Sequence, residues 1–425
     1  MKLNYKRTIL VGFAFFLISA FWQAYDTVVP LILTDKFGMK QAYSGIIMAL
    51  DNIFALVMLP IFGALSDRTR TVWGRRTPYI AIGAVCASVA FSFLGIISNL
   101  TLFIIVLLLS LTAMATFRSP AVALMPDVTI KPLRSKGNAV INLMGTAGGI
   151  LVLLLTKVFG TDKHDNTEFA GYILTVAAVM IVALIIFLLT VREPLWVKEM
   201  EDKTAELGCD EEVKEREHEG GKLSRAQMMS FIFILASVFF WFFGYNAVTT
   251  KYSVYAKDFL HVSYSTTLLI AQAAAIVSYL PVGMIASKIG RKKTILAGVA
   301  MLFAAFLGAS FIRQGTATGL MYPLFALAGI AWATINVNSF PMVVELAKDS
   351  DCGKYTGFYY TASMTAQILT PVISGLLMDT VGFASLFPYA AIFAGIAFFT
   401  MLMVKHGDSK PSVEQSVMES LEAED

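Results

Sequence analysis

The chain has 425 residues, of which 57% are hydrophobic and only 15% are charged, with a formal net charge of +3. A water-soluble protein of this length carries roughly a quarter of charged residues. The composition therefore excludes an ordinary soluble enzyme or binding domain and indicates that most of the chain lies in lipid.

Motifs that would indicate an enzyme or an ATP-driven pump do not occur in the sequence. It has no glycine-rich phosphate loop, no zinc motif and no spacing typical of a catalytic triad. Of the three cysteines, Cys86 lies in an apolar run and Cys209 and Cys352 lie in loops predicted to face the cytoplasm, so no disulfide is expected. None has metal-ligand spacing, and we predict no enzymatic activity, no metal and no cofactor.

In chain order, apolar runs long enough to cross a bilayer recur about twelve times. They cover residues 8–34, 43–65, 78–97, 100–126, 138–159, 169–191, 228–252, 265–286, 294–312, 320–346, 355–378 and 384–404. Loops rich in Lys and Arg alternate with poorer ones, which places both termini in the cytoplasm by the positive-inside rule. We therefore predict an all-α protein of the inner or plasma membrane.

The polar stretch 192–226, rich in Glu and Lys, divides the chain. It predicts an N-terminal six-helix bundle at 1–191 and a C-terminal six-helix bundle at 227–404. The stretch itself is expected to be a cytoplasmic central loop, partly helical or mobile, and a solvated linker is favoured over a regulatory segment. Residues 405–425 form a polar, acidic tail, also predicted to be cytoplasmic.

A short basic loop lies between the second and third apolar runs. It extends from Gly63 to Pro78 and contains Asp67 and four arginines. The Gly…Gly-Arg pattern returns between Gly283 and Arg291, at an offset of 283 − 63 = 220 residues. Any cytoplasmic loop of a membrane protein is basic, but that does not explain the repeated spacing. Internal repeats of this kind are typical of transporter folds.

In these residues the chain resembles the major facilitator superfamily, whose signature loop joins the second and third helices. The positions that match are Gly63, Asp67, Arg68, Gly74, Arg75 and Arg76, and in a weaker second copy Gly283, Gly290 and Arg291. The resemblance implies twelve transmembrane helices in two pseudo-symmetric six-helix bundles. It also implies a loop that latches the two halves on the cytoplasmic side without touching substrate. Asp127, at the end of the fourth helix, is assigned to the same cytoplasmic gate.

An ionisable group inside a spanning helix is costly and is therefore a functional candidate. Asp26 lies eight residues before Thr34, and Asp51 lies eight residues after Tyr43. At the helical rise both should sit about 12 Å deep, where two carboxylates could share a cavity and a proton. Arg118, near the cytoplasmic end of the fourth helix, could pair with a deprotonated aspartate, or it could snorkel to the interface. We predict proton coupling at Asp26, Asp51 and Arg118.

Sugars bind by stacking on aromatic rings while amides and carboxylates bond their hydroxyls. The predicted substrate-binding set is Trp22, Gln23, Tyr25, Asp26, Arg118, Asn142, Tyr245, Asn246, Gln272, Trp332, Asn336, Tyr360 and Gln367. Anchoring at the membrane interface is the alternative for the Trp and Tyr residues near helix ends. Lys251 and Glu345 lie nearer helix ends, where structural roles are expected.

The loop is more specific than the general signature. The stretch from Asp67 to Pro78 resembles the loops of glycoside–pentoside–hexuronide:cation symporters and of proton-coupled sucrose transporters, and Pro120 to Asp127 resembles the end of the fourth helix in both. Where the symporters place a second sodium-site carboxylate, this chain has Ala55, which favours H+ over Na+ as the coupling ion. The symporters also have a sugar-binding acid on the fourth helix, and this chain has the residues around Arg118 in that region instead. No mid-membrane lysine appears on the eleventh helix of this chain.

The sequence thus predicts a proton-coupled symporter for a di- or oligosaccharide or a glycoside, working by alternating access. Its predicted partners are the sugar and the lipid bilayer, with no nucleic acid, and the chain is expected to be a monomer. One alternative is a drug or metabolite proton antiporter of the same fold, in which an inward proton gradient suppresses uptake. Another is a non-transporting membrane sensor, which binds ligand without accumulating it.

Overall fold

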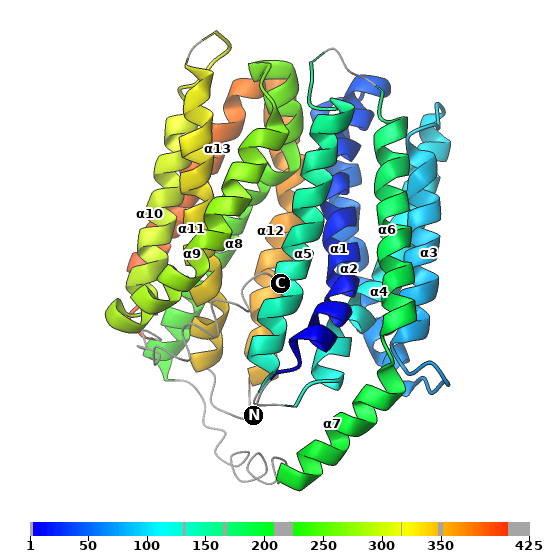
Figure 1. Ribbon diagram of the computed structural model, residues 1–425. Coiled ribbons are helices and arrows are strands. Elements are labelled where there is room, and N and C mark those ends of the chain that lie inside the picture. Colours follow the sequence, from blue (N-terminus) through cyan, green and yellow to red (C-terminus); the bar gives the residue numbers. More distant parts are fainter. Residues whose placement is uncertain are drawn as a thin grey trace. The chain divides into compact units, whose positions relative to one another are not determined.

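The computed structural model describes residues 3–130, 133–164, 168–207, 224–315, 317–346 and 352–406, and every regular element within them is a helix (Figure 1). The elements are α1 (Tyr5–Leu31), η1 (Ile32–Lys36), α2 (Gln41–Arg68), α3 (Thr77–Leu94), α4 (Leu100–Asp127), α5 (Arg134–Phe159), α6 (Ala170–Thr190), α7 (Glu193–Leu207), α8 (Arg225–Val254), η3 (Tyr255–Leu260), α9 (Tyr264–Ile289), α10 (Arg291–Ala309), η4 (Thr318–Leu320), α11 (Met321–Leu346), α12 (Cys352–Thr380), η5 (Phe383–Ser385) and α13 (Leu386–Leu402).

Eleven helices in the described ranges are long and apolar enough to cross a membrane, and α9 makes twelve if its two parts count as one span. The two parts of α9, Tyr264–Tyr279 and Pro281–Ile289, meet at an angle of 50°. A proline inside a helix removes one backbone hydrogen bond and commonly causes such a bend. The predicted all-α membrane fold is confirmed.

Helix ends follow local capping chemistry. The Asn4 side chain accepts the backbone N–H of Arg7 at 3.2 Å, and Ser224 and Gln227 form a capping box at the start of α8. The fifth helix was expected from residue 138 but begins at Arg134, because the guanidinium of Arg134 bonds the carbonyls of Pro126 and Thr129 at 3.0 and 3.2 Å.

By their internal contacts the residues form two compact units. The first comprises Met1–Gly38 and Leu50–Asp210, and the second comprises Met39–Ala49 and Glu211–Asp425. The first turns of α2 therefore belong to the second unit and the rest of α2 to the first. The predicted boundaries at 191 and 227 fall close to this division without coinciding with it.

Within the first unit, α1 packs against α5 and α6, and α3 packs against α4 and α6. Glycines on α5 allow the close approach of α1: a β-carbon at Gly148 would lie 2.6 Å from the carbonyl oxygen of Phe16. Gly145 and Gly148 of α5 therefore form part of its packing surface against α1.

The start of the central loop is helical. In Figure 1, α7 follows α6 and runs obliquely to it. Glu193 is 1% exposed and Trp196 is 7% exposed, so the expectation of a solvated linker is wrong for this part. Residues 208–223 of the loop and 407–425 of the predicted tail lie outside the described residues.

Within the second unit, α8 packs against α12 and α13, and α11 packs against α9 and α10. Lys251 lies in the last turn of α8, as the sequence predicts, and α8 continues directly into η3. The Lys251 side chain is fully buried. The side chain of Glu345 lies outside the described residues.

Candidate transport site and signature-loop network

The first unit brings the predicted ionisable residues together. Asp26 of α1, Asp51 of α2 and Arg118 of α4 are partly exposed, and the charges of Asp51 and Arg118 both act on the carboxyl of Asp26. Arg118 also acts on Asp51, whose Oδ1 accepts the backbone N–H and the side-chain amide of Asn52 at 2.6 and 2.7 Å. Two acids and one base therefore form one cluster on three spanning helices.

An aromatic group borders this cluster. The Arg118 guanidinium lies 5.5 Å from the ring centre of Trp22, and Trp22 meets Tyr25 edge to face at 5.4 Å. The indole N–H of Trp22 is buried and has no hydrogen-bond acceptor in the described part of the chain. Such a donor is suited to a ligand hydroxyl or carboxylate.

Other predicted residues of the first unit are less available. Tyr25 is fully buried and Asn142 on α5 is 4% exposed, so neither presents a free surface. Gln23 is partly exposed, and its backbone carbonyl accepts the Thr27 hydroxyl at 2.6 Å.

In the second unit, the predicted residues divide into a stacked pair and scattered positions. Tyr245 of α8 and Trp332 of α11 stack with ring centres 3.7 Å apart and planes within 5°. Asn246, next to Tyr245, donates to the Phe242 carbonyl at 2.9 Å. The remaining members are Gln272 on α9, Asn336 on α11, Gln367 on α12, all partly buried, and Tyr360 on α12, which is 42% exposed.

Asp127 and Asp67 bind two of the four arginines of the signature loop (residues 63–78), Arg75 and Arg76. Asp127 accepts Nε of Arg75 at 3.0 Å and Nε of Arg76 at 2.8 Å, and it pairs with Nη2 of Arg75 at 2.6 Å. Arg76 also pairs with Asp67 and bonds Ser66. Burial alone would lower the pKa of Arg76, but hydrogen bonds and charges of Asp127 and Asp67 outweigh it and raise that pKa. Arg76 is therefore a fixed cation.

Sequence reasoning missed Glu193, the first residue of α7. Its carboxylate accepts the backbone N–H groups of Arg75, Arg76 and Thr77 at 2.7 to 3.1 Å. Gly74 leaves room for it, with φ of +108° and no β-carbon. The signal in the sequence was an acid just after an apolar run, which composition alone does not separate from a linker residue.

Two further loop positions have simple roles. Gly63 allows close packing, because a β-carbon there would lie 2.8 Å from Oγ of Ser119. Arg68, at the end of α2, is exposed.

The second copy of the pattern repeats the backbone but not the charges. Gly290 has φ of +96°, close to that of Gly74, and Gly283 is buried. Arg291 is fully buried, so it is not a loop charge. Lys292 instead donates to the carbonyls of Leu402 and Val404 at 3.1 and 2.5 Å, which closes the end of α13.

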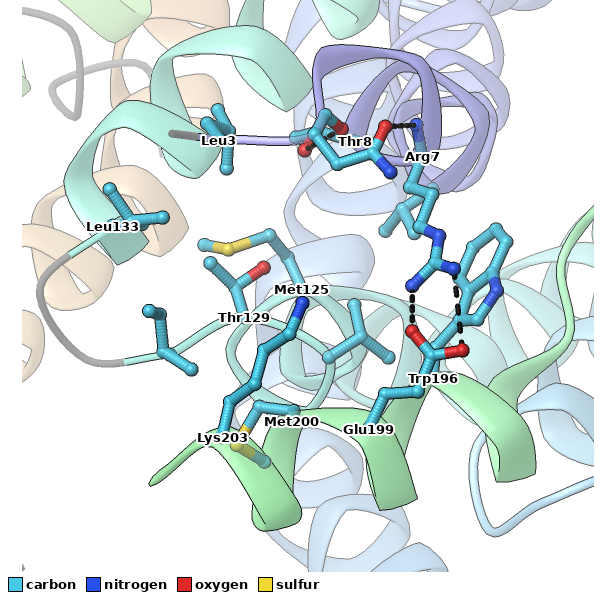
Figure 2. Close-up of a pocket in the computed structure, with 14 residues that line it drawn as sticks. Leu3, Arg7, Thr8, Met125, Thr129, Leu133, Trp196, Glu199, Met200 and Lys203 are labelled. Carbon is cyan, nitrogen blue, oxygen red and sulfur yellow. Dashed lines mark hydrogen bonds and ion pairs between the residues drawn. The ribbon is translucent and has the colours of Figure 1, made fainter. Parts of the chain in front are cut away.

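A cavity of about 320 Å³ lies in the first unit between the start of α1, the end of α4 and α7 (Figure 2). Arg7 forms an ion pair with Glu199 on its wall and lies 5.2 Å from the ring centre of Trp196. These contacts fasten α7 to α1. The hydrogen bond from Arg7 lowers the pKa of Glu199.

The fold and the loop define a secondary membrane transporter, and comparison with known proteins assigns its family. The family model described as Major Facilitator Superfamily matches residues 11–348 and 265–422. The chain belongs to this superfamily.

Individual relatives are distant. An uncharacterized MFS-type transporter of Methanocaldococcus jannaschii is 23% identical over 94% of this chain and 95% of its own length. A sucrose transport protein of Arabidopsis thaliana is 29% identical over 29% of this chain and 24% of its own length. The inward-open xylose transporter XylE of E. coli superimposes with a TM-score of 0.69 over 97% of this chain and 99% of XylE, at 15% identity, which shows the fold alone.

Proposed function

We propose that this transporter carries a sugar together with a proton, as a symporter that alternates between two states. The observation that carries the proposal is the cluster of Asp26, Asp51 and Arg118 on α1, α2 and α4. Two carboxylates that interact across a spanning bundle favour sharing a proton over both being charged. Arg118 offers a counter-charge when the proton leaves.

Each unit, taken by itself, has features that suit a sugar. In the first unit, the carboxylates and the Trp22 indole N–H offer polar contacts for sugar hydroxyls. In the second, the Tyr245–Trp332 stack offers an outer ring face for the apolar side of a sugar ring. The partial similarity to a sucrose transport protein supports this substrate class.

The test is uptake of labelled sucrose, maltose and melibiose into proteoliposomes under an imposed proton gradient or sodium gradient. We expect proton-driven accumulation that is lost in Asp51→Asn and Asp26→Asn. Asp202→Asn, which changes an exposed carboxylate on α7, is the matched control and should accumulate sugar normally. Sodium-driven uptake would contradict the coupling ion, and failure of all sugars under both gradients would contradict the symporter.

A second candidate is the proton antiport of a metabolite. The observation that favours it is Arg118 itself, since a cation beside Trp22 in a spanning helix also suits an anionic substrate. Antiport predicts that an outward-directed substrate gradient drives protons inward, which a pH-sensitive dye inside the vesicles measures. Symport predicts the opposite proton flow.

A further inference from the structure

The start of α2 is held by an acid from a distant helix. Oδ1 of Asp379, at the end of α12, accepts the backbone N–H of Gln41 at 2.8 Å, and Oδ2 accepts that of Ala42 at 2.7 Å. The first amides of a helix have no partner of their own and carry the positive end of its dipole. One carboxylate thus satisfies two of these groups and the dipole together.

A buried lysine holds the same turn from α8. Nζ of Lys251 donates to the backbone carbonyl of Gln41 at 2.7 Å and to its Oε1 at 3.4 Å. Lys251 is 0% exposed, and the charge of Asp379 acts on it. A buried ammonium is costly without acceptors, so this lysine depends on the position of α2.

Two glycines bring the backbones into contact at this point. A β-carbon at Gly375 would lie 2.3 Å from the Gln41 carbonyl oxygen, and one at Gly45 would lie 2.0 Å from that of Pro371. Both collisions would be with backbone atoms, which cannot rotate away. The packing of α2 against α12 therefore leaves no room for a side chain at Gly45 or Gly375.

We propose that these residues form a latch on the first turns of α2, and that Lys251 and Asp379 are positioning residues whose release is a step of the transport cycle. The inference rests on the proposed alternating mechanism. The first turns of α2 belong to the second unit while Leu50 onward belongs to the first, so this helix joins the two units. Both polar contacts and both glycine contacts involve its first two turns, so they are made or lost together.

Ser44 provides a direct reporter. It is 0% exposed inside the latch, and its hydroxyl has no partner among the described residues, so Ser44→Cys removes no hydrogen bond. In a background with Cys86, Cys209 and Cys352 replaced by serine, we would measure the alkylation rate of this cysteine by a water-soluble maleimide in proteoliposomes. Alkylation should be slow in the parent and about tenfold or more faster with Asp379→Asn, which removes the negative charge and replaces one of the two acceptor oxygens with an NH2 group.

Matched variants distinguish local release of the first turns of α2 from a general loss of packing in the protein. Gly375→Ala should also speed alkylation, whereas Gly357→Ala on the same helix should not, because a β-carbon there meets nothing within 4 Å. Lys251→Met keeps the apolar stem and should act like Asp379→Asn, and Asp379→Glu should restore part of the protection. Ser237→Cys, at a fully buried site on α8, should stay protected in every variant.

The latch is overturned if Ser44→Cys reacts in the parent as fast as an exposed cysteine, if Asp379→Asn and Gly375→Ala leave its rate unchanged, or if Ser237→Cys is exposed in parallel. The alkylation needs no substrate, so it succeeds or fails independently of sugar uptake. For the role in transport, Asp379→Asn should change the rate of proton-driven uptake while Gly357→Ala leaves it unaltered.

Discussion

The Glu193 carboxylate accepts both the backbone N–H and the hydroxyl of Thr77, at 2.8 and 2.7 Å. This contact closes the N-terminus of α3 with an acid that belongs to α7, 116 residues further along the chain. The signature loop is thus positioned by the helix that opens the central loop, in addition to its own arginines and aspartates.

Replacing Gly74 tests this closure. Gly74→Ala places a β-carbon 2.3 Å from Cδ of Glu193 at a φ of +108°, so strain and collision coincide. Gly382→Ala is the control, since its φ is +107° and a β-carbon meets nothing within 4 Å. We expect the control to lose about 1 kcal/mol from strain, and Gly74→Ala to lose clearly more. Thermal unfolding in detergent measures both, and equal losses would contradict the role of Glu193.

The two aspartates that contact Arg76 should differ in how much they contribute to the stability of the folded protein. The Asp127 side chain is 13% exposed and that of Asp67 is 57% exposed, while the Arg76 side chain is 5% exposed. Asp127→Asn removes the negative charge that pairs with the buried guanidinium of Arg76, and it should lower the free energy of unfolding by about 3–5 kcal/mol. Asp67→Asn should cost less than about 1 kcal/mol. The midpoints of thermal unfolding rank them, and a larger effect at Asp67 would be inconsistent with this network.

Lowering the pH should weaken the contact between α7 and α1 that the ion pair of Glu199 and Arg7 provides. The pKa of Glu199 is lowered in the folded protein, chiefly by the hydrogen bond from Arg7. The ion pair therefore stabilises the folded protein fully above the pKa that Glu199 has in the unfolded chain, and this stabilisation is lost as the pH falls through the lower pKa of the folded state. Because Arg7 lies over Trp196, the Trp196 fluorescence, isolated by difference from Trp196→Phe, should change below about pH 4.3. Glu199→Gln should abolish this pH dependence, and a change that survives in Glu199→Gln would refute it.

The aromatic stack of the second unit should matter for sugar affinity. Tyr245→Phe keeps the ring pair and should leave affinity within about threefold, whereas Trp332→Ala removes the ring and should weaken it about tenfold. Trp73→Ala, whose side chain is 63% exposed in the signature loop, is the control and should bind normally. Substrate-induced quenching or equilibrium dialysis gives the affinities, and a Trp332→Ala variant that binds like the parent would remove the stack from the site.

The sequence predicted the helices well because each spanning run must satisfy its backbone internally and stay apolar. The same reasoning predicts Asp26 and Asp51 at one depth, since helical rise converts residue number into distance, and the charge of Asp51 does act on Asp26. It also identified Gly74 and Gly290, whose shared positive φ explains their recurrence in the repeat.

What the sequence did not disclose depends on contacts between remote segments. Glu193, Lys251 and Asp379 gain their roles from the loop or helix start that each one touches, and no local pattern indicates those partners. The sequence placed Lys251 near a helix end, but it gave no sign that the side chain would be fully buried against Gln41. Asn142 and Tyr25 were included for their chemistry, but their burial limits what they can contact.

The division of α2 between the two units bears on how the protein can be taken apart. A chain cut within the central loop and expressed as two halves would separate residues 41–49 from the unit they pack in. The second half alone would fold with Lys251 lacking its acceptors on Gln41 and with Asp379 lacking the amides that it caps. The surface of α12 around Gly375, which contacts the start of α2 in the whole protein, would then face lipid or water. The two halves, although related by an internal repeat, are therefore not autonomous folding modules, and the second is complete only when the first supplies the start of α2.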